Sequence, residues 1–576
     1  MKTKLIISLF ALAVFIVLQL SESAYSYTWG DTLTVIQRPL LNIPALVEPE
    51  GVFQAWLKSP ETEDDWQGEL LLNGLSFPLD KVTQTYNTAF AYWQVYFQTM
   101  LDMPLELYDF RVYNSEGEWD ISQHAVSVDW EQQGNYQFAV ICDSHLPTVE
   151  YWTNPEPDSS VIPDVLAVYE DLAIIHPRFI LHLGDLVDQG YLEEYQNRHQ
   201  MGRAQEVLAQ SPAPIFLIAG NHDVGGCDSP NFPFPAGCAR QYWWKYYGWS
   251  WLENPPDDHY TQDYTFGYGG DLFIGMEAYQ LYDHWREQIY NYLSFCPTAM
   301  AWLNNALSVS GYNNRILFTH WDYSRQIDPA AFDLDMVLYG HIHINYGSLT
   351  QQPYVLSLEN VCEHFKSLYG RAYMLVSVVN GELHPRPVLY AGHNGEKLTL
   401  DYYPDNSGTH PNVSAVISNA NSQSISNALI KINYPLNVEQ FEVQNGELVQ
   451  TINYDINRTL YIRCDIPAEG EQIITVISSM QAGVRAAQPG NLAMLNCHPM
   501  PFNASAIFYF ELNSSAFIEL NLYTITGKLA AKIASGSFPG GKSVVRFKNT
   551  TLPSGIYFAR LQTGKEILIQ KVIILR

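Results

Sequence analysis

The chain has 576 residues, of which 47% are hydrophobic and 14% aromatic, and its 60 acidic and 31 basic residues give a net charge of −29. This composition excludes a largely disordered chain, a collagen-like chain and a coiled coil. The acidic balance disfavours duplex nucleic acid and anionic membrane surfaces as partners, because both are bound through clusters of lysine and arginine. A phosphate-bearing ligand stays compatible with such a chain if metal ions supply the positive charge.

The first segment, residues 1–26, is predicted to be a secretory signal peptide. Lys2 and Lys4 precede an apolar run from Leu5 to Leu18, and small and polar residues follow it. The run is shorter than the roughly 20 residues that a spanning helix needs, so cleavage is favoured over an uncleaved membrane anchor. No second apolar stretch of spanning length follows, so we expect an exported mature chain without a transmembrane segment.

The remaining chain changes pattern several times, which predicts a multidomain α/β plus all-β protein. Short alternating runs separated by turn residues, such as Leu107 to Tyr113, indicate β-sandwiches. Apolar strand-like runs that alternate with helical patterns indicate α/β architecture. Helices are expected at Asp164 to Ile175 and after a cap at Thr298. The predicted segments are a β-sandwich at 27–133, an α/β domain at 135–392, a β-sandwich at 397–479, a linker at 480–490 and a strand-rich domain at 491–576.

Seven cysteines in an exported chain leave at least one of them unpaired. Cys227 and Cys238 bracket a short loop rich in glycine and proline, and they are the candidates for a local disulfide. Cys142 ends an apolar run and is expected to be a buried free thiol.

Polar side chains follow several apolar runs of the α/β domain, each directly past the carboxyl end of a predicted strand. The segments are Asp143-Ser144-His145, Gly184-Asp185-Leu186-Val187-Asp188, Gly220-Asn221-His222-Asp223, Thr319-His320 and Gly340-His341-Ile342-His343. This edge of an α/β sheet is where ligands bind, and the glycines allow the chain to turn sharply there. The sequence therefore predicts one site that all five segments share.

The residue types of these segments indicate a metal centre. Aspartate, asparagine and histidine offer oxygen and nitrogen donors without a thiolate, a set that suits Zn, Fe or Mn. Two ions about 3.5–4 Å apart can clamp a phosphoryl group and hold a hydroxide between them. A histidine that is not a ligand can then protonate the leaving oxygen.

The ordered set of D-x-H, G-D-x-x-D, G-N-H-D, a lone histidine and G-H-x-H resembles the calcineurin-like metallophosphoesterase superfamily, which includes the purple acid phosphatase and phosphodiesterase types. The resemblance covers residues 135–392 and implies an α/β/β/α sandwich of two sheets, here flanked by Ig-like or fibronectin-like β-sandwiches. It implies that Asp143, His145 and His343 bind one ion, that Asn221, His320 and His341 bind a second, that Asp185 bridges both, that His222 assists the leaving group, that Asp223 orients His222, and that Asp188 supports the ligands.

This resemblance implies an exported phosphoesterase that uses two transition-metal ions, Mn, Fe or Zn. A bridging hydroxide would attack the phosphorus of a phosphomonoester or phosphodiester from a small molecule or the cell envelope. Trp321 and Asp322 stand where the family often has a second histidine or a proline, and Asp223 stands where many members have glutamate. These departures remove no ligand and leave the substrate open. The alternative is a cell-surface binding or adhesion protein with a degenerate phosphoesterase domain, against which the complete ligand set argues.

Other candidate residues are interpreted as structural. Histidines outside the motifs, including His176, His182 and His199, are taken as surface or core residues. The aromatic run from Tyr242 to Trp251 is interpreted as packing around an inserted loop, and a lid that stacks on substrate is the alternative.

The C-terminal region resembles the type A sorting domain of the bacterial type IX secretion system. The segment Leu552-Pro553-Ser554-Gly555-Ile556-Tyr557 carries most of the resemblance, and Pro499-Met500-Pro501 and Thr524-Ile525-Thr526-Gly527 carry the rest, with Met500 and Thr524 departing from the usual pattern. The resemblance implies a small β-sandwich that the type IX machinery recognises. It also implies release from the cell or attachment to its surface.

Overall fold

The computed structural model describes residues 31–574 except 64, 73, 102, 130–133, 147–160, 189–193, 225–237, 256–260, 278–293, 321–322, 363–369, 393–394, 396, 455–456, 479–491, 499–501, 503–504, 525–527, 549–551, 554 and 565. The predicted signal peptide, the predicted linker, Cys227, Trp321 and Asp322 lie outside the described residues. Within the described residues, no helix has the length and apolar character needed to cross a membrane.

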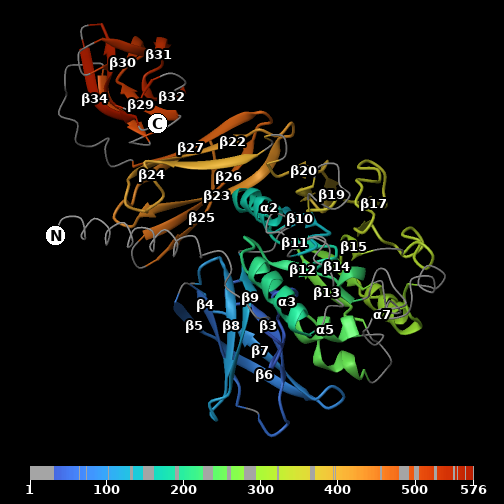
Figure 1. Cartoon of the computed structure of the whole chain (residues 1–576). Helices are drawn as coiled ribbons and strands as arrows, with labels where there is room; N and C mark the ends of the chain where they lie inside the picture. Colours follow the sequence, from blue (N-terminus) through green and yellow to red (C-terminus); the bar gives the residue numbers. More distant parts are fainter. Residues whose placement is uncertain are drawn as a thin grey trace, which may run out of the picture. The chain divides into compact units, whose positions relative to one another are not determined.

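Residues 36–128 form two facing sheets, with strand orders β1-β3-β7-β6 and β2-β9-β8-β4-β5 (Figure 1). The strands are β1 (Ile36–Arg38), β2 (Ala45–Val47), β3 (Val52–Lys58), β4 (Gln67–Leu72), β5 (Leu75–Pro78), β6 (Asp80–Asn87), β7 (Tyr92–Gln98), β8 (Leu107–Tyr113) and β9 (Trp119–Val128). Alternate residues of β3 and β8 are buried, as expected for strands with one face in a core. The edge of the Phe110 ring meets Phe53 of the other sheet at 5.4 Å between centroids, so the two sheets share one apolar core.

Two mixed sheets form the core of the α/β region. Their strand orders are β12-β11-β10-β18-β19, with β20 also paired to β18, and β13-β14-β15-β16-β17. The strands are β10 (Tyr136–Ile141), β11 (Ile180–His182), β12 (Ile215–Leu217), β13 (Tyr264–Tyr268), β14 (Asp271–Met276), β15 (Arg315–Thr319), β16 (Met336–Tyr339), β17 (Tyr354–Ser357), β18 (Ala372–Val379), β19 (Glu382–Pro385) and β20 (Leu389–Tyr390). The rings of Phe138 and Phe273 meet edge to face at 5.3 Å between centroids, which joins the two sheets face to face.

Strands β10, β11 and β12 run parallel to one another, as do β14 to β17. Strands β10 and β14 are buried along their whole length, which explains why most of their residues are apolar. The carboxyl ends of parallel neighbours meet at one edge of a sheet, so this topology brings their following loops together.

The helices of this region are short, and α2 is the best anchored. They are α2 (Ile162–Ile175), α3 (Glu194–Leu208), α4 (Asn221–Val224), α5 (Cys238–Tyr246), the 3-10 helix η2 (Ser250–Glu253) and α7 (Pro297–Leu307). The Tyr373 hydroxyl on β18 donates a hydrogen bond to the Asp171 carboxylate on α2 at 3.0 Å. The predicted cap at Thr298 is wrong, because Cys296 is the N-cap and its Sγ accepts from the Ala299 N–H. Pro297 fixes this earlier start, since proline is favoured in the first turn.

The N-terminal β-sandwich and the α/β region are joined by close contacts. The N–H of Leu217, in the outermost strand β12, donates to the Asn42 carbonyl at 2.9 Å, and the Asn42 amide donates to the Tyr247 carbonyl at 3.0 Å. The Trp251 ring stacks on Tyr92 at 4.9 Å between centroids. Most of the aromatic run that includes Trp251 is buried, which agrees with its interpretation as packing.

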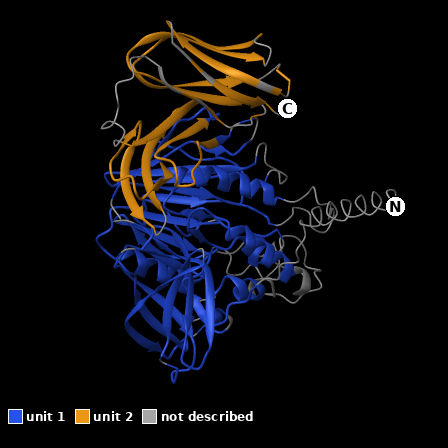
Figure 2. Ribbon diagram, turned by 90° about the vertical axis from the view of Figure 1, so that its left-hand side faces the viewer, with its two compact units in different colours: residues 1–398, 419–428 blue, residues 399–418, 429–576 orange. Residues whose placement is uncertain are grey.

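The chain divides into two compact units, residues 1–398 with 419–428 and residues 399–418 with 429–576 (Figure 2). Unit 2 contains four antiparallel sheets, ordered β21-β22-β27-β24, β23-β26-β25, β28-β29-β32 and β31-β30-β33-β34. The strands are β21 (Leu398–Tyr403), β22 (Asn412–Asn419), β23 (Ile425–Pro435), β24 (Phe441–Gln444), β25 (Glu447–Asn453), β26 (Asn457–Ile466), β27 (Gly470–Ser478), β28 (Leu492–His498), β29 (Ser505–Leu512), β30 (Ala516–Thr524), β31 (Leu529–Phe538), β32 (Gly541–Lys548), β33 (Gly555–Thr563) and β34 (Glu566–Ile574).

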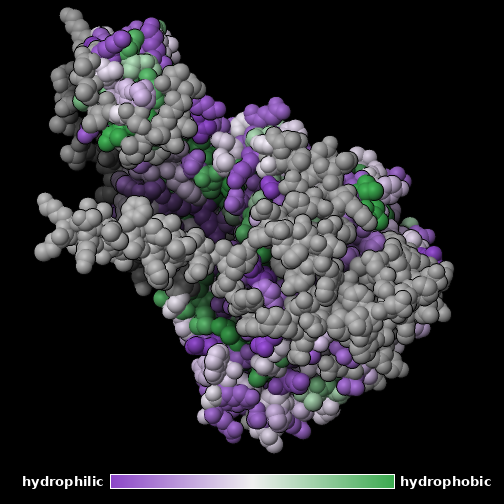
Figure 3. All heavy atoms as spheres, in the orientation of Figure 1, coloured by the Kyte–Doolittle hydropathy of each residue, from purple (hydrophilic) through white to green (hydrophobic). Residues whose placement is uncertain are grey.

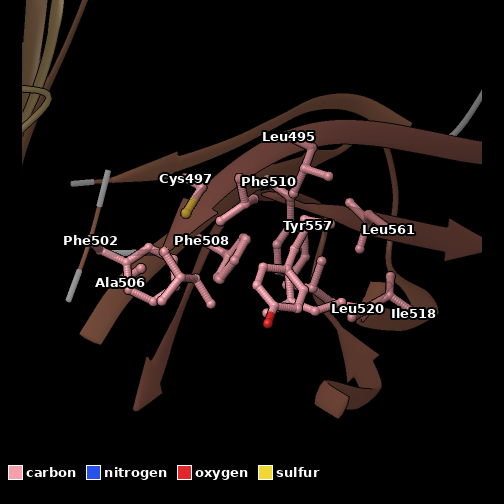
Figure 4. Packing of buried hydrophobic residues seen from close by; sticks show 14 of the residues in the cluster. Leu495, Cys497, Phe502, Ala506, Phe508, Phe510, Ile518, Leu520, Tyr557 and Leu561 are labelled. Carbon is pink, nitrogen blue, oxygen red and sulfur yellow. The ribbon is translucent and has the colours of Figure 1, made fainter. Parts of the chain in front are cut away.

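Strands β28 to β34 enclose a core of their own. Phe508, Phe510, Leu520 and Tyr557 are buried in it together (Figure 4). The Tyr557 hydroxyl also donates to the Pro553 carbonyl at 3.0 Å, which closes the turn that leads into β33. Tyr557, the last residue of the Leu-Pro-Ser-Gly-Ile-Tyr segment, therefore has a packing role in this domain.

The structure confirms the predicted fold class, a mixed α/β core accompanied by antiparallel all-β sheets. The predicted domain boundaries stay predictions. The described residues on the face in Figure 3 are mostly hydrophilic, with hydrophobic residues in small groups between them.

Candidate metal centre

The predicted ligand side chains come from the carboxyl ends of strands in both core sheets. Asp143 follows β10, Asp185 follows β11 and Asn221 follows β12, while His320 follows β15 and both His341 and His343 follow β16. The loops after β10 and β11 stay side by side, because the N–H groups of Asp143 and His145 donate to the carbonyls of Gly184 and Asp185 at 3.0 Å. The five sequence segments thus converge on one place.

The first group of donor atoms comprises Asp143, His145 and His343. Asp143 Oδ1 lies 3.2 Å from His343 Nε2 and 4.0 Å from His145 Nε2. One ligand atom from each residue lies within 4.8 Å of the others, which is close enough for a single ion to contact all three.

The second group comprises Asp185, His320 and His341. Asp185 Oδ2 lies 3.1 Å from His320 Nε2. Asn221 Oδ1 joins this group, at 3.0 Å from His320 Nε2 and 2.7 Å from His341 Nδ1. One ligand atom from each member of the carboxylate–histidine trio again lies within 4.8 Å of the others.

Asp185 lies between the two groups. Its Oδ2 is 4.0 Å from His145 Nε2 of the first group and 3.1 Å from His320 Nε2 of the second. The donors are oxygens and imidazole nitrogens, which fit Zn, Fe or Mn, and a carboxylate between two donor groups can serve two ions. The geometry therefore fits a dinuclear centre.

Most of these residues have an unusual backbone. Positive φ angles occur at Asp143 (53°), His145 (47°), Asp185 (53°), His341 (66°) and His343 (55°). Residues with a Cβ rarely adopt this left-handed conformation, which costs roughly 1–2 kcal/mol for each residue. Such strain is concentrated at functional sites, where surrounding contacts hold it in place.

Two of the motifs require glycine because a carboxylate oxygen lies too close to the backbone to leave room for a side chain. A Cβ on Gly340 would lie 2.7 Å from Asp143 Oδ2, and a Cβ on Gly220 would overlap Asp185 Oδ1. Each glycine thus allows a carboxylate of the candidate centre to lie against the neighbouring loop.

The charges of the cluster are mutually dependent. Burial opposes ionisation of Asp143, but His343 and His320 outweigh it and lower the pKa of Asp143. Burial opposes the charge of His320, yet Asp185 and Asp143 raise its pKa to about 9. Burial and the nearby His320 lower the pKa of His341 to about 3. The buried carboxylates therefore hold a positive charge among them, which is the role that metal ions would take over.

His222 lies beside the two groups. Its Nδ1 donates to the Asp188 carbonyl at 2.5 Å, and its ring meets the His145 ring at 4.6 Å between centroids. This bond assigns the proton of the neutral ring to Nδ1, so Nε2 is the nitrogen that exchanges a proton. The carboxylate of Asp188 lies 3.6 Å from His145 Nδ1, which brings Asp188 next to a predicted ligand.

Asp223 supports the loops. Its carboxylate accepts backbone N–H bonds from Gly220 at 2.8 Å, Val187 at 2.9 Å and Leu186 at 3.2 Å. These bonds tie the loop after β12 to the loop after β11. The hydrogen bond described for the His222 ring goes to the Asp188 carbonyl and not to Asp223, so the predicted orienting role of Asp223 stays a prediction.

His182 joins the site, although the sequence analysis interprets it as structural. It is buried at the end of β11, where its Nδ1 accepts from the Gly184 N–H at 3.3 Å and its Nε2 lies 2.8 Å from Ser144 Oγ. Burial lowers the pKa of His182 to about 4, so the ring is neutral and Nε2 donates. The signal in the sequence is its position, two residues before Gly184 and three before Asp185.

Among the described residues, no cysteine contributes a donor to either group. Cys142 is buried and free, as predicted. The predicted disulfide involves Cys227, outside the described residues, and is untested.

A comparison with protein families supports a phosphoesterase site in the part of the chain that contains the candidate ligands. The family model described as calcineurin-like phosphoesterase matches residues 136–345. No curated protein matches the chain.

Solved structures with low similarity include a purple acid phosphatase from yellow lupin (Lupinus luteus) seeds, at 12% identity over 65% of this chain and 71% of that chain, with a TM-score of 0.34. A predicted phosphoesterase from Streptococcus pneumoniae is 12% identical over 45% of this chain and 91% of that chain, with a TM-score of 0.21. Vps29 from Entamoeba histolytica, complexed with zinc, is 13% identical over 43% of this chain and 97% of that chain, with a TM-score of 0.18.

The family match spans the strands whose carboxyl ends carry all the candidate ligands. Residues 136–345 therefore form a calcineurin-like phosphoesterase domain, which belongs to a family of metal-dependent phosphoric ester hydrolases that typically bind two metal ions.

Proposed function

We propose that the chain hydrolyses phosphomonoesters or phosphodiesters with two transition-metal ions, Mn, Fe or Zn, bound at the candidate metal centre. The observation that carries this proposal is the convergence of two donor groups, each with a carboxylate and two imidazoles, around Asp185. When bound, such ions act as Lewis acids on the phosphoryl oxygens and activate a water nucleophile.

The chain's own residues would divide the remaining work. Asp143, His145 and His343 would hold one ion, Asn221, His320 and His341 the other, and Asp185 both. The bond from Nδ1 to the Asp188 carbonyl orients the His222 ring. In its protonated form, His222 would donate the Nε2 proton to the leaving oxygen.

The first test is hydrolysis of para-nitrophenyl phosphate and its bis ester by the full chain with Mn, Zn or no added metal. We expect turnover that depends on metal. His222→Ala is expected to lower kcat by about 10²–10⁴-fold, the usual size of a proton-transfer contribution, while metal content stays unchanged. Asp185→Asn is expected to lower the metal content as well as kcat.

The exposed His384, outside the centre, provides the matched control His384→Ala, which is expected to keep full activity and metal content. Turnover that His222→Ala and Asp185→Asn leave intact would contradict the proposed site. Absence of both metal and turnover in the purified and reconstituted chain would favour a degenerate binding or adhesion protein instead.

We also propose that the chain is exported, with its C-terminal domain recognised by the type IX secretion machinery, and that it is released or attached to the cell surface. The sequence of residues 1–26 supports export, and the compact seven-strand domain of β28 to β34 supports a separable sorting domain. The buried Tyr557 and its bond to Pro553 give the sorting segment a defined turn.

This export proposal is tested by expression in a bacterium that has the type IX system. Removal of residues 491–576 is expected to leave the protein in the periplasm, while the full chain reaches the surface or the medium. Surface delivery of the truncated chain would refute the proposal. Phosphoesterase activity of the retained protein, measured after cell lysis, separates a sorting failure from a folding failure.

A further inference from the structure

Unit 2 contains a cavity of about 560 Å³, whereas the metal-ligand residues belong to unit 1. Strands β21, β22, β24 and β27 supply part of its lining, and β28, β29, β32 and β34 supply the rest. A volume of several hundred cubic ångströms is typical of small-molecule sites. The proposed phosphoesterase activity gives this cavity no role.

One wall of the cavity is aromatic. The Tyr403 ring lies 5.7 Å from the Tyr509 ring and 6.4 Å from the His498 ring, between centroids, and all three residues line the cavity. Flat aromatic faces with polar tips suit ligands that have both an apolar face and hydroxyl groups.

Two buried polar atoms in the lining lack a hydrogen-bond partner among the described residues, Tyr509 Oη and Gln570 Oε1. A buried polar atom without a partner is destabilising, so such atoms normally meet a ligand or water. Tyr509 Oη can donate or accept and Gln570 Oε1 accepts, which is the pattern that a polyhydroxylated ligand can satisfy.

The charge of the lining is opposite to that of the whole chain. The chain has 60 acidic residues, yet no aspartate or glutamate is among the residues that line the cavity. Lys542 lines it, and its Nζ makes a long bond of 3.4 Å to Asn412 Oδ1. Its cross-strand neighbour Glu511 is not part of the lining, but its negative charge acts on Lys542. Burial lowers the pKa of Lys542 and the charge of Glu511 opposes this shift, so the ammonium group is partly desolvated.

From the aromatic wall, the two unpartnered polar atoms and the single lining lysine, we propose that this cavity binds a sugar that carries one carboxylate, a uronic acid unit. The sugar ring lies against Tyr403 and Tyr509, its hydroxyl groups bond to Tyr509 Oη and Gln570 Oε1, and its carboxylate pairs with Lys542. A single partly desolvated cation matches one negative charge better than a phosphate dianion.

The test is calorimetric titration of the full chain with glucuronic acid and with glucose. We expect glucuronic acid to bind at least about tenfold more tightly than glucose, which corresponds to about 1.4 kcal/mol. Lys542→Met keeps the alkyl stem and removes the charge. It is expected to weaken glucuronic acid binding at least about tenfold and to change glucose binding less than about twofold.

Tyr509→Phe removes one hydroxyl group and is expected to weaken the binding of both sugars about threefold or more. Lys532→Met, at an exposed position on β31, is the matched control and should bind as the wild type does. Neither Lys542→Met nor Tyr509→Phe is expected to change phosphoesterase activity. Thermal unfolding of each variant separates lost binding from lost folding.

Three results would overturn the proposal. The first is a wild-type chain that binds no glucuronic acid, and the second is equal affinity for glucuronic acid and glucose. The third is binding that both Lys542→Met and Tyr509→Phe leave unchanged, because the sugar would then bind elsewhere.

Discussion

Individual side chains outside the donor groups set the positions of the candidate ligands. His182 connects the loop after β10 with the loop after β11, through Ser144 on one side and the Gly184 N–H on the other. Both loops contain residues with left-handed backbone. The spacing between the two loops therefore depends on a side chain that contacts no ligand atom directly.

His182→Leu is expected to lower metal affinity about 10–100-fold, the usual effect of losing a residue that supports ligands. His182→Gln retains a hydrogen-bond donor and an acceptor, so its metal affinity should lie between those of His182→Leu and the wild type. Metal content after dialysis against graded chelator measures the effect. An unchanged metal affinity in His182→Leu would show that the bond to Ser144 is dispensable.

Gly340→Ala places a methyl group against Asp143 Oδ2, at 2.7 Å in the present geometry. Because Asp143 must then move, we expect metal affinity and kcat to fall about 10–100-fold. Gly134→Ala is the control, since its Cβ would meet its nearest neighbour at an ordinary 3.7 Å. Equal losses in both variants would mean that the effect is general destabilisation.

Single elements show which parts of the protein can be predicted from its sequence. The end of β10 is predictable because the whole strand is buried and its run from Phe138 to Ile141 is apolar, so the polar residues that follow mark the sheet edge. The start of α7 was predicted at the wrong residue because Thr298 is a common cap, whereas Cys296 is not. The role of His182 was missed because its partner Ser144 is brought to it only by the pairing of β10 with β11.

Helix α2 carries a pH-sensitive contact. Burial raises the pKa of Asp171 to about 7, although bonds from Tyr373 and the Leu398 N–H lower it. Because the unfolded group titrates near 3.9, the folded chain binds more protons between about pH 4 and 7, and stability falls as pH rises through that range.

Asp171→Asn should remove this fall in stability. The change in the free energy of unfolding from pH 4.5 to pH 7.5 should therefore be more favourable in the variant than in the wild type, by roughly 1–3 kcal/mol. Urea unfolding of both proteins at the two pH values measures the difference. An identical pH dependence in wild type and variant would refute the contribution of Asp171.

A mutation at the aromatic contact between η2 and the N-terminal sandwich distinguishes a packing role of the aromatic run from a role as a lid over the substrate. Trp251→Ala removes the ring stacked on Tyr92 and should cost about 2 kcal/mol of stability, while kcat/KM changes less than about twofold. Trp119→Ala, at a residue that is 64% exposed, is the control and should cost less than about 0.5 kcal/mol. A raised KM in Trp251→Ala would instead support a lid.

At the scale of the whole molecule, net charge opposes the arrival of an anionic substrate. The chain has a net charge of −29, so a phosphomonoester dianion is repelled at long range. Raising the ionic strength from about 0.01 to 0.15 M shortens the screening length from about 30 to 8 Å.

We therefore expect kcat/KM for para-nitrophenyl phosphate to rise a few-fold between these salt concentrations. The bis ester carries a single charge, so its kcat/KM should rise less with salt. The ratio of kcat/KM for the two esters is therefore an internal control. A ratio that is independent of salt would show that the field at the metal centre, rather than the whole chain, governs substrate arrival.

The contact between Asn42 and Leu217 has a consequence for how the protein can be shortened. Strand β12 is the last strand of its sheet, and the Asn42 carbonyl accepts a hydrogen bond from its outer side. Uncovered strand edges recruit strands from other molecules. A phosphoesterase domain expressed without residues 31–128 would therefore expose the edge of β12 to pairing with other chains. This edge lies beside the loop that carries Asn221 and His222. We therefore expect a shortened chain that lacks the N-terminal sandwich to self-associate more readily than the full chain.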